Sequence, residues 1–205
     1  MHFQPYTTTS QKVGYYSLRV LCGLILLFLV LPILVIVPLS FSSDSFLSYP
    51  LPGLSLRWYE EVLNSPAWTA AIKNSLIVGS ASTLLATILG TLAAMGLNMC
   101  NFRGKAAMTA MMISPMVVPV VISALGLYFF FAEVGLNASY TGLILAHTAL
   151  GAPFVLITVS ATLKGFDTNL MRAGASLGAN PSQVFFKIVL PLILPGAVSG
   201  ALFAF

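Results

Sequence analysis

The chain has 205 residues, of which 58% are hydrophobic and only 7% are charged, and its formal net charge is +4. A soluble globular chain carries roughly 25% charged residues, and a mean hydropathy of +0.97 leaves too little polar surface to cover a water-facing core. These values exclude soluble enzymes, nucleic-acid-binding proteins and disordered linkers, and they predict an integral membrane protein.

Long stretches without Asp, Glu, Lys or Arg divide the chain, and each is long enough for a helix of about 20 residues to cross the hydrocarbon core. The predicted spans cover residues 19–41, 73–98, 106–131, 139–163 and 188–205. The predicted fold class is therefore an all-α integral membrane protein, a polytopic helical bundle with five readable spans. Because the fifth span closes at Phe205 without a polar anchor, we expect it to be truncated and the complete protein to have six.

The basic residues are sorted by membrane side, which predicts the orientation. If the N-terminal segment 1–18 is cytoplasmic, the inner side holds Lys12, Arg19, Arg103, Lys105, Lys164, Arg172 and Lys187. The outer side then keeps only Arg57 and Lys73. Since basic residues accumulate in cytoplasmic loops, we expect a multi-pass protein with its N-terminus in the cytoplasm. The first span is too long for a signal peptide and is interpreted as an uncleaved anchor.

The longest outer segment, residues 42–71, is predicted to be a loop with a short helix over Ser55–Asn64. Ser55 is placed to cap this helix, and Trp58 and Tyr59 are suited to the membrane interface. An interfacial helix that anchors the loop is favoured over a ligand-binding loop.

The sequence holds no phosphate-binding loop, no G-x-S-x-G elbow and no metal-ligand spacing, so no catalytic, cofactor or metal site is predicted. His147 is the only ionisable side chain deep within a span, and we expect a neutral imidazole bonded to a neighbouring helix. No mid-membrane carboxylate is present to couple protons or sodium. Gly196 and Gly200 form a G-x-x-x-G pair suited to close helix approach.

The cytoplasmic segment 164–187 has the pattern of a short helix, a sharp turn and a second helix. Asp167 is placed to cap the first helix, whose apolar positions are Leu170, Ala173 or Gly174, and Leu177. Gly178 is suited to end it in a left-handed conformation. Asn180, Pro181 and Gln183 then form the expected start of the next helix, with a capping box. On the residues alone, both a docking element for a cytoplasmic partner and a helix resting at the interface fit this pattern.

The same segment resembles the signature loop of bacterial type I ABC importer permeases. Arg172-Ala173-Gly174, three residues, Gly178, nine residues and Ile188-x-Leu190-Pro191 match the family pattern Glu-Ala-Ala, three residues, Gly, nine residues, Ile-x-Leu-Pro. Asn74-Ser75-Leu76 and Leu145-Ala146-His147-Thr148 also look like this family. The resemblance covers residues 54–205 and implies a type I transmembrane domain over 72–205. It departs at Arg172, where the family has Glu, and at Gly174, where it has Ala.

The resemblance implies a transport subunit rather than an enzyme, located in the bacterial inner membrane. Its implied partners are a cytoplasmic ABC ATPase dimer that binds the ATP, a second permease subunit and a periplasmic substrate-binding protein. The implied ATPase-coupling residues are Leu170, Arg172, Ala173, Gly174, Leu177, Gly178, Asn180, Pro181, Ile188, Leu190 and Pro191. Of these, Leu170, Ala173, Gly174 and Leu177 are expected to make the contact, and Gly178, Asn180 and Pro181 to set the shape.

The stretch Ser55-Leu56-Arg57-Trp58-Tyr59 looks most like the spermidine/putrescine permease branch, which implies a polyamine substrate. Permeases for ferric iron, sulfate or aminoethylphosphonate share much of this scaffold and stay open as alternatives. Two other classes also stay open. A secondary transporter would work without an ATPase, and a structural membrane subunit would show no substrate-dependent activity.

Overall fold

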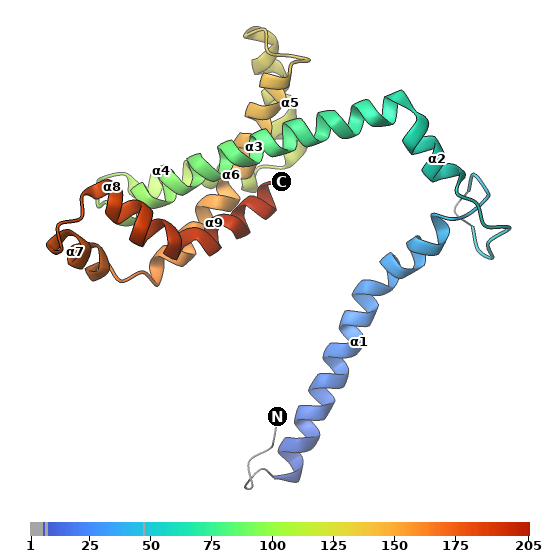
Figure 1. The fold of residues 1–205 in the computed structure, drawn as a ribbon, viewed down its shortest axis with the longest axis horizontal. Coiled ribbons are helices and arrows are strands. Elements are labelled where there is room, and N and C mark those ends of the chain that lie inside the picture. Colours follow the sequence, from blue (N-terminus) through green and yellow to red (C-terminus); the bar gives the residue numbers. More distant parts are fainter. Residues whose placement is uncertain (1–5, 7, 47) are drawn as a thin grey trace. The chain divides into compact units, whose positions relative to one another are not determined.

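The computed structural model describes residues 6, 8–46 and 48–205, and nearly all of them are helical (Figure 1). The helices are α1 (Thr9–Leu39), α2 (Arg57–Asn64), α3 (Pro66–Met99), α4 (Lys105–Val117), α5 (Val120–Glu133), α6 (Tyr140–Lys164), α7 (Asn169–Ser176), α8 (Pro181–Val184), the π-helix η1 (Phe185–Val189) and α9 (Leu190–Ala204). In the described part of the chain, extended backbone pairs only at an isolated bridge between Ser42 and Leu54. The predicted all-α fold is confirmed.

Four helical segments of the described chain are long and apolar enough to cross a membrane, and the α4–α5 pair would bring the number to five. The four are α1, α3, α6 and the continuous segment from Pro181 to Ala204. Such segments satisfy their backbone hydrogen bonds internally, as the hydrocarbon core requires. The fold is that of a polytopic helical membrane protein.

The helices begin earlier than the predicted spans. Helix α1 starts at Thr9, so much of the segment predicted as 1–18 is helical; its residues 1–5 and 7 lie outside the described ones. Helix α3 starts at Pro66 rather than at residue 73. Charged residues, from which the spans were predicted, indicate where the hydrocarbon core of the membrane ends. A helix can extend beyond that point, and capping residues determine where it begins. At α1 the cap is Thr8, whose hydroxyl and N–H both bond to Gln11 in a capping box.

The predicted single span 106–131 is not one continuous helix. Helices α4 and α5 meet at an angle of 102°. Between them Val118 is extended, with φ −70° and ψ 135°, and Pro119 follows. A proline disfavours the helical conformation in the residue before it. The break at Val118 is the local consequence of Pro119, a position at which the sequence permits a kink within the predicted span.

The chain divides into two compact units, residues 1–70 and 71–205, which are described separately. In the first unit the chain folds back after α1: the Ser43 N–H bonds to the Gly53 carbonyl at 3.1 Å and the Ser55 N–H to the Phe41 carbonyl at 2.8 Å. The Tyr59 hydroxyl of α2 bonds to the Ser40 hydroxyl at 2.7 Å. These bonds fasten the loop to the end of α1.

Helix α2 starts at Arg57, two residues later than the predicted Ser55–Asn64 helix. Its cap position is Leu56, whose side chain makes no capping bond. Ser55 is therefore not the cap residue, although its hydroxyl accepts the Arg57 N–H at 3.1 Å. The Arg57 guanidinium lies over the Trp58 ring, 4.3 Å from its centroid.

The core of the second unit lies where α6 packs against α9, drawn side by side in orange and red in Figure 1. Val155 and Val159 of α6 and Ile193 of α9 are fully buried. A β-carbon on Gly200 would lie 2.6 Å from the Val155 Cα, a distance that two helices cannot tolerate. Gly90 gives α3 a similarly close approach to Val155. Small residues thus bring the helices together, as the G-x-x-x-G pair predicted.

Candidate functional site

The loop between α6 and α9 contains the signature residues, and its first ordered element is α7. Thr168 occupies the cap position of α7 without a side-chain bond, and the Asp167 carboxylate accepts the Asn169 N–H at 2.9 Å. The carboxylate therefore satisfies a first-turn donor from one residue before the cap. An acidic group at this end of a helix is also favoured by the helix dipole.

The turn that ends α7 is built around Gly178, which has a φ of 86°. The Ala179 N–H bonds to the Gly174 carbonyl at 3.1 Å, and the Gly178 N–H bonds to the Ala175 carbonyl at 3.0 Å. This pair of bonds around a left-handed residue is a Schellman motif. Only glycine adopts such a φ at little cost, so the sharp turn depends on this residue.

The next helix starts at once. The Asn180 side chain accepts the Gln183 N–H at 2.9 Å, and the Gln183 side chain accepts the Asn180 N–H at 3.0 Å. Pro181 follows the cap, where its missing N–H costs nothing. The predicted capping box is present, and with the Schellman motif it fixes the path of the chain through the turn.

One face of α7 packs inward. Gly174 is buried, and a β-carbon there would lie 2.6 Å from Ile188 Cδ1 and 3.5 Å from Val184 Cγ2. The sequence pattern places Gly174 among the partner-contacting residues, whereas in this structure Gly174 packs against Ile188 of the same chain. Positions 173 and 174 are both compatible with the apolar spacing, but they point about 100° apart on a helix, and the structure turns only Ala173 outward.

The neighbouring face of α7, turned away from Ile188, is apolar and exposed. Leu177 is 89% exposed and Leu170 44% exposed, and Ala173 lies between them. Arg172 is exposed on the flank of this face. We call Leu170, Ala173 and Leu177 the α7 outer face. Exposed apolar side chains at helical spacing, beyond the end of a membrane span, are typical of a surface that another protein covers.

The remaining signature residues follow the loop in the chain, at the start of the last span. Ile188 and Leu190 are half-buried, and Pro191 is exposed at the start of α9. The Leu190 N–H bonds to the Phe185 carbonyl, five residues back, which makes η1 a π-helix. Pro191 has no N–H to donate, so a change in the helical hydrogen-bond pattern occurs where α9 begins. Ile188 acts here as a packing residue against Gly174.

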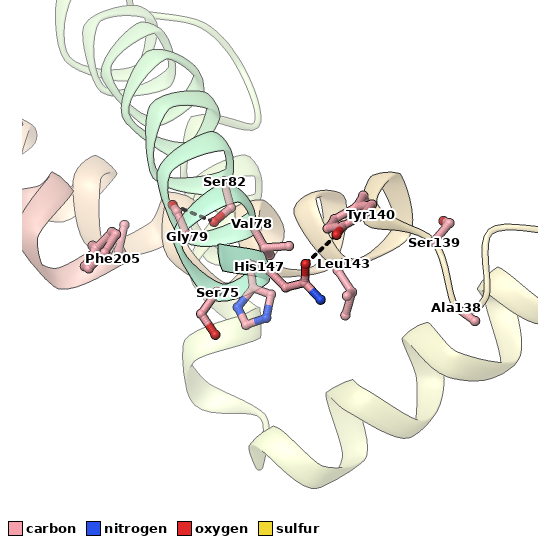
Figure 2. Close-up of a pocket in the computed structure, with 12 residues that line it drawn as sticks. Ser75, Val78, Gly79, Ser82, Ala138, Ser139, Tyr140, Leu143, His147 and Phe205 are labelled. Atoms are coloured by element: carbon pink, nitrogen blue, oxygen red, sulfur yellow. Dashed lines mark hydrogen bonds between the residues drawn. The ribbon is translucent and has the colours of Figure 1, made fainter. Parts of the chain in front are cut away.

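A second candidate site is a polar cavity of about 550 Å³ between α3 and α6 (Figure 2). Asn74 and Ser75 of α3 line it together with Tyr140 and His147 of α6. The Tyr140 hydroxyl donates a hydrogen bond to Asn74 Oδ1 at 2.5 Å, drawn as a dashed line in Figure 2. Among the described residues, no Asp, Glu, Lys or Arg lines this cavity.

His147 is exposed on the wall of this cavity. The expectation that its ring bonds to a neighbouring helix is not met: within the described residues the imidazole makes no hydrogen bond. Polar groups without partners are costly in lipid. A wall that carries an unpartnered imidazole beside Ser75 is therefore suited to water or to another protein surface, and not to lipid.

The pairing of Asn74 with Tyr140 was not anticipated from the sequence. The two short stretches that look like the type I family, at residues 74–76 and 145–148, each contribute to the one cavity, through Asn74 and Ser75 and through His147. The polar residues in these two spans indicate that each span has a face unsuited to lipid. The sequence does not predict the register that brings together Asn74 and Tyr140, which are 66 positions apart in the chain.

The long apolar helices define the class: a multi-pass helical membrane protein. The profile of the family "Binding-protein-dependent transport system inner membrane component" matches residues 86–205. The chain belongs to this family, whose members are the membrane subunits of ABC importers and not enzymes.

Curated relatives extend the similarity toward the N-terminus. The chain is 36% identical over 179 residues to the spermidine/putrescine transport system permease protein PotC of Haemophilus influenzae, covering 87% of this chain and 69% of the relative. It is 35% identical over 185 residues to the putrescine transport system permease protein PotI of Escherichia coli, covering 87% and 66%. The molybdenum transport system permease protein ModB of Mycobacterium bovis is 27% identical over 176 residues, covering 78% and 67%.

Proposed function

We propose that this chain forms half of the translocation pathway of a polyamine importer, with putrescine or spermidine as the transported solute. The observation that carries the proposal is the similarity to PotC and PotI over 87% of the chain, at 36% and 35% identity. The molybdenum permease relative is less similar, at 27% identity. Polyamine is therefore favoured over molybdenum as the substrate.

The cavity lined by Asn74, Ser75 and Tyr140 suits a cationic solute in transit. Carbonyl and hydroxyl oxygens of Asn74, Ser75 and Tyr140 can accept hydrogen bonds from ammonium groups, while a buried carboxylate would hold a polycation tightly. Passage requires binding that is favourable enough for entry and weak enough for release. The absence of Lys and Arg from the lining, among the described residues, also avoids repulsion of a cation.

In the proposed importer, the α7 loop couples ATP hydrolysis by a partner subunit to transport. In this proposal the α7 outer face docks on one subunit of a cytoplasmic ATPase dimer, which binds and hydrolyses ATP. A second permease subunit completes the pathway, and a periplasmic binding protein delivers the solute. The docking contact has only to differ between two states of the ATPase pair in order to shift the permease between conformations. The N-terminus and the α7 loop then lie on the cytoplasmic side, in agreement with the distribution of Lys and Arg.

Affinity purification of the tagged complete protein from native membranes tests the assembly. We expect a nucleotide-binding subunit and a second permease in near-stoichiometric amounts, identified by mass spectrometry. Recovery of the chain alone, together with uptake that survives ATP depletion but not an uncoupler, would instead favour a secondary transporter.

Uptake of radiolabelled putrescine and spermidine in a deletion strain tests the substrate. We expect uptake to fall and to return with the wild-type gene but not with Gly178→Asp, which disturbs the left-handed turn and adds a charge beside the docking face. Membrane insertion of the variant should be unchanged. Polyamine uptake unaffected by the deletion would reject the substrate, and normal uptake by the inserted variant would reject the coupling role of the loop.

A further inference from the structure

A second cavity, of about 360 Å³, lies among α3, α4 and α6 and is distinct from the polar cavity described above. Lys105 at the start of α4 and Lys164 at the end of α6 both line it. No carboxylate lines it among the described residues. Two ammonium groups therefore face one cavity without a protein counter-ion in its wall.

The lining of this cavity is ordered by depth. Six of the ten lining residues form three layers by their helix positions: Lys105 with Lys164, Thr109 with Ser160, and Ile113 with Ile157; Leu97, Asn98, Leu156 and Ala161 complete the lining. Members of successive layers are four residues apart on α4 and three or four apart on α6, so each layer lies about 6 Å deeper along the helices than the one before. The wall thus passes from cationic to hydroxyl to branched aliphatic over about 12 Å.

The two lysines and Ser160 retain donors for a ligand, whereas the Thr109 hydroxyl already donates its proton to the Lys105 carbonyl at 2.8 Å. Asn98 Nδ2 donates to Ser160 Oγ at 2.8 Å, which leaves the Ser160 proton available to another acceptor. The Lys105 ammonium is 3.4 Å from the Cys100 carbonyl oxygen, a long contact that occupies one of its three donors. These donors favour an anion with several oxygen atoms.

We propose that this cavity binds an anionic phospholipid of the cytoplasmic leaflet. The phosphate lies between Lys105 and Lys164, an ester oxygen accepts the free proton of Ser160, and the start of an acyl chain follows Ile113 and Ile157. Basic pockets between helices at the cytoplasmic face are a recognised means of holding anionic headgroups. The inference rests on the proposed orientation, which puts both lysines at the inner leaflet.

The order of the layers distinguishes this ligand from other anions. Free phosphate, or an acidic side chain of a partner subunit, would use the two ammonium groups but would leave the aliphatic layer unfilled. The proposed polycationic substrate would be repelled by both lysines. A molecule with a charged head, a polar middle and an apolar tail matches all three layers.

Native mass spectrometry of the detergent-solubilised complete protein, with any subunits that copurify, tests the proposal. The probes are phosphatidylglycerol and phosphatidylcholine with the same acyl chains. We expect the wild type to retain phosphatidylglycerol preferentially, and Lys105→Gln/Lys164→Gln to lose about 30-fold in that preference, as two lysines at an anionic surface predict. The matched control Lys12→Gln/Arg103→Gln, which removes two basic groups from the same predicted side, should keep it.

Further measurements separate the sources of the anion and cover misfolding. Lys105→Arg/Lys164→Arg should keep the preference, which shows that a loss in the Gln variant is a loss of charge. Glycerol 3-phosphate and inorganic phosphate should not displace the lipid at millimolar concentration. Displacement by either, equal loss in the control variant, or no preference in the wild type would overturn the proposal. None of these readouts depends on transport, so failure of the polyamine assignment leaves the test intact.

Discussion

The α6–α9 pair and α7 both use glycine for close packing, but they differ in how much apolar surface stays exposed beside it. In the pair, Gly196 and Gly200 of α9 approach α6 closely, and Val155 of α6, which faces Gly200, is fully buried. In α7, Gly174 lets the helix pack closely on Ile188, while the neighbouring face leaves Leu177 almost entirely exposed. The first region completes its packing within the chain, and the second completes only half of it.

This difference separates contacts that stabilise the fold from a surface that is available to a partner. A helix that buries all its small residues gains stability from contacts within the chain. A helix of eight residues that keeps an apolar face exposed forgoes that gain, because short helices are only marginally stable without packing. The caps at both ends of α7 and the contact of Gly174 with Ile188 hold it in place, so that the outer face is preformed.

The largest expected effect breaks the completed interface. In Gly200→Ala the new β-carbon would lie 2.6 Å from the Val155 Cα, a backbone atom that cannot move without separating the helices. We expect a loss of about 2 kcal/mol in unfolding free energy, measured by thermal unfolding with fluorescence-detected size exclusion. The matched control is Gly126→Ala on α5, where nothing lies within 4 Å. There we expect no loss and a gain of up to about 1 kcal/mol. Equal destabilisation of both variants would contradict the role of close approach.

The next effect is on transport rather than on stability. Leu177→Asp places a charge on the 89% exposed α7 outer face and should reduce uptake about tenfold or more, because an apolar contact at a docking surface is replaced by an unpaired charge. Expression and thermal unfolding should stay at wild-type values. Ser176→Asp, which adds the same charge on the flank of α7, is the control and should keep most of the uptake. If both variants transport equally, the α7 outer face is not the docking surface.

A smaller effect on stability is expected from the hydrogen bond that joins α3 and α6 at the polar cavity. Tyr140→Phe removes the 2.5 Å bond to Asn74 Oδ1 and should lower the unfolding free energy by about 0.6 kcal/mol, the average for hydrogen bonds between membrane helices. Tyr128→Phe on α5, whose ring is 60% exposed, should be neutral. A double-mutant cycle with Asn74→Ala measures the coupling directly. Zero coupling would mean that the bond does not hold α3 to α6.

The smallest expected effect concerns Gly174. The β-carbon of Gly174→Ala would meet Ile188 Cδ1, the flexible end of a side chain, so the clash and the helix-propensity gain of about 1 kcal/mol nearly cancel. Removing that methyl group in Gly174→Ala/Ile188→Val should release the gain. The double variant should therefore be more stable than the sum of the single changes predicts. Simple additivity would show that Gly174 and Ile188 do not interact.

Much of the loop was predictable because its geometry is local. The left-handed Gly178, the Asn180–Gln183 capping box and Pro181 after the cap each depend on residues within a few positions. The facing of α7 was not predictable, since positions 173 and 174 both fit the apolar spacing. Pro119 permits a kink between α4 and α5, but neither the proline nor hydropathy predicts how large the bend is.

The sequence by itself determined the membrane class, the approximate positions of the spans, the turn at Gly178 and the family resemblance, because composition, charge-free length and capping are properties of neighbouring residues. Only the tertiary structure decided which residues from distant spans meet. It paired Asn74 with Tyr140, set Lys105 beside the same cavity as Lys164, and turned Gly174 inward. The physical reason is that helix register is fixed by side-chain packing between segments far apart in the chain, and small residues determine how closely those segments approach.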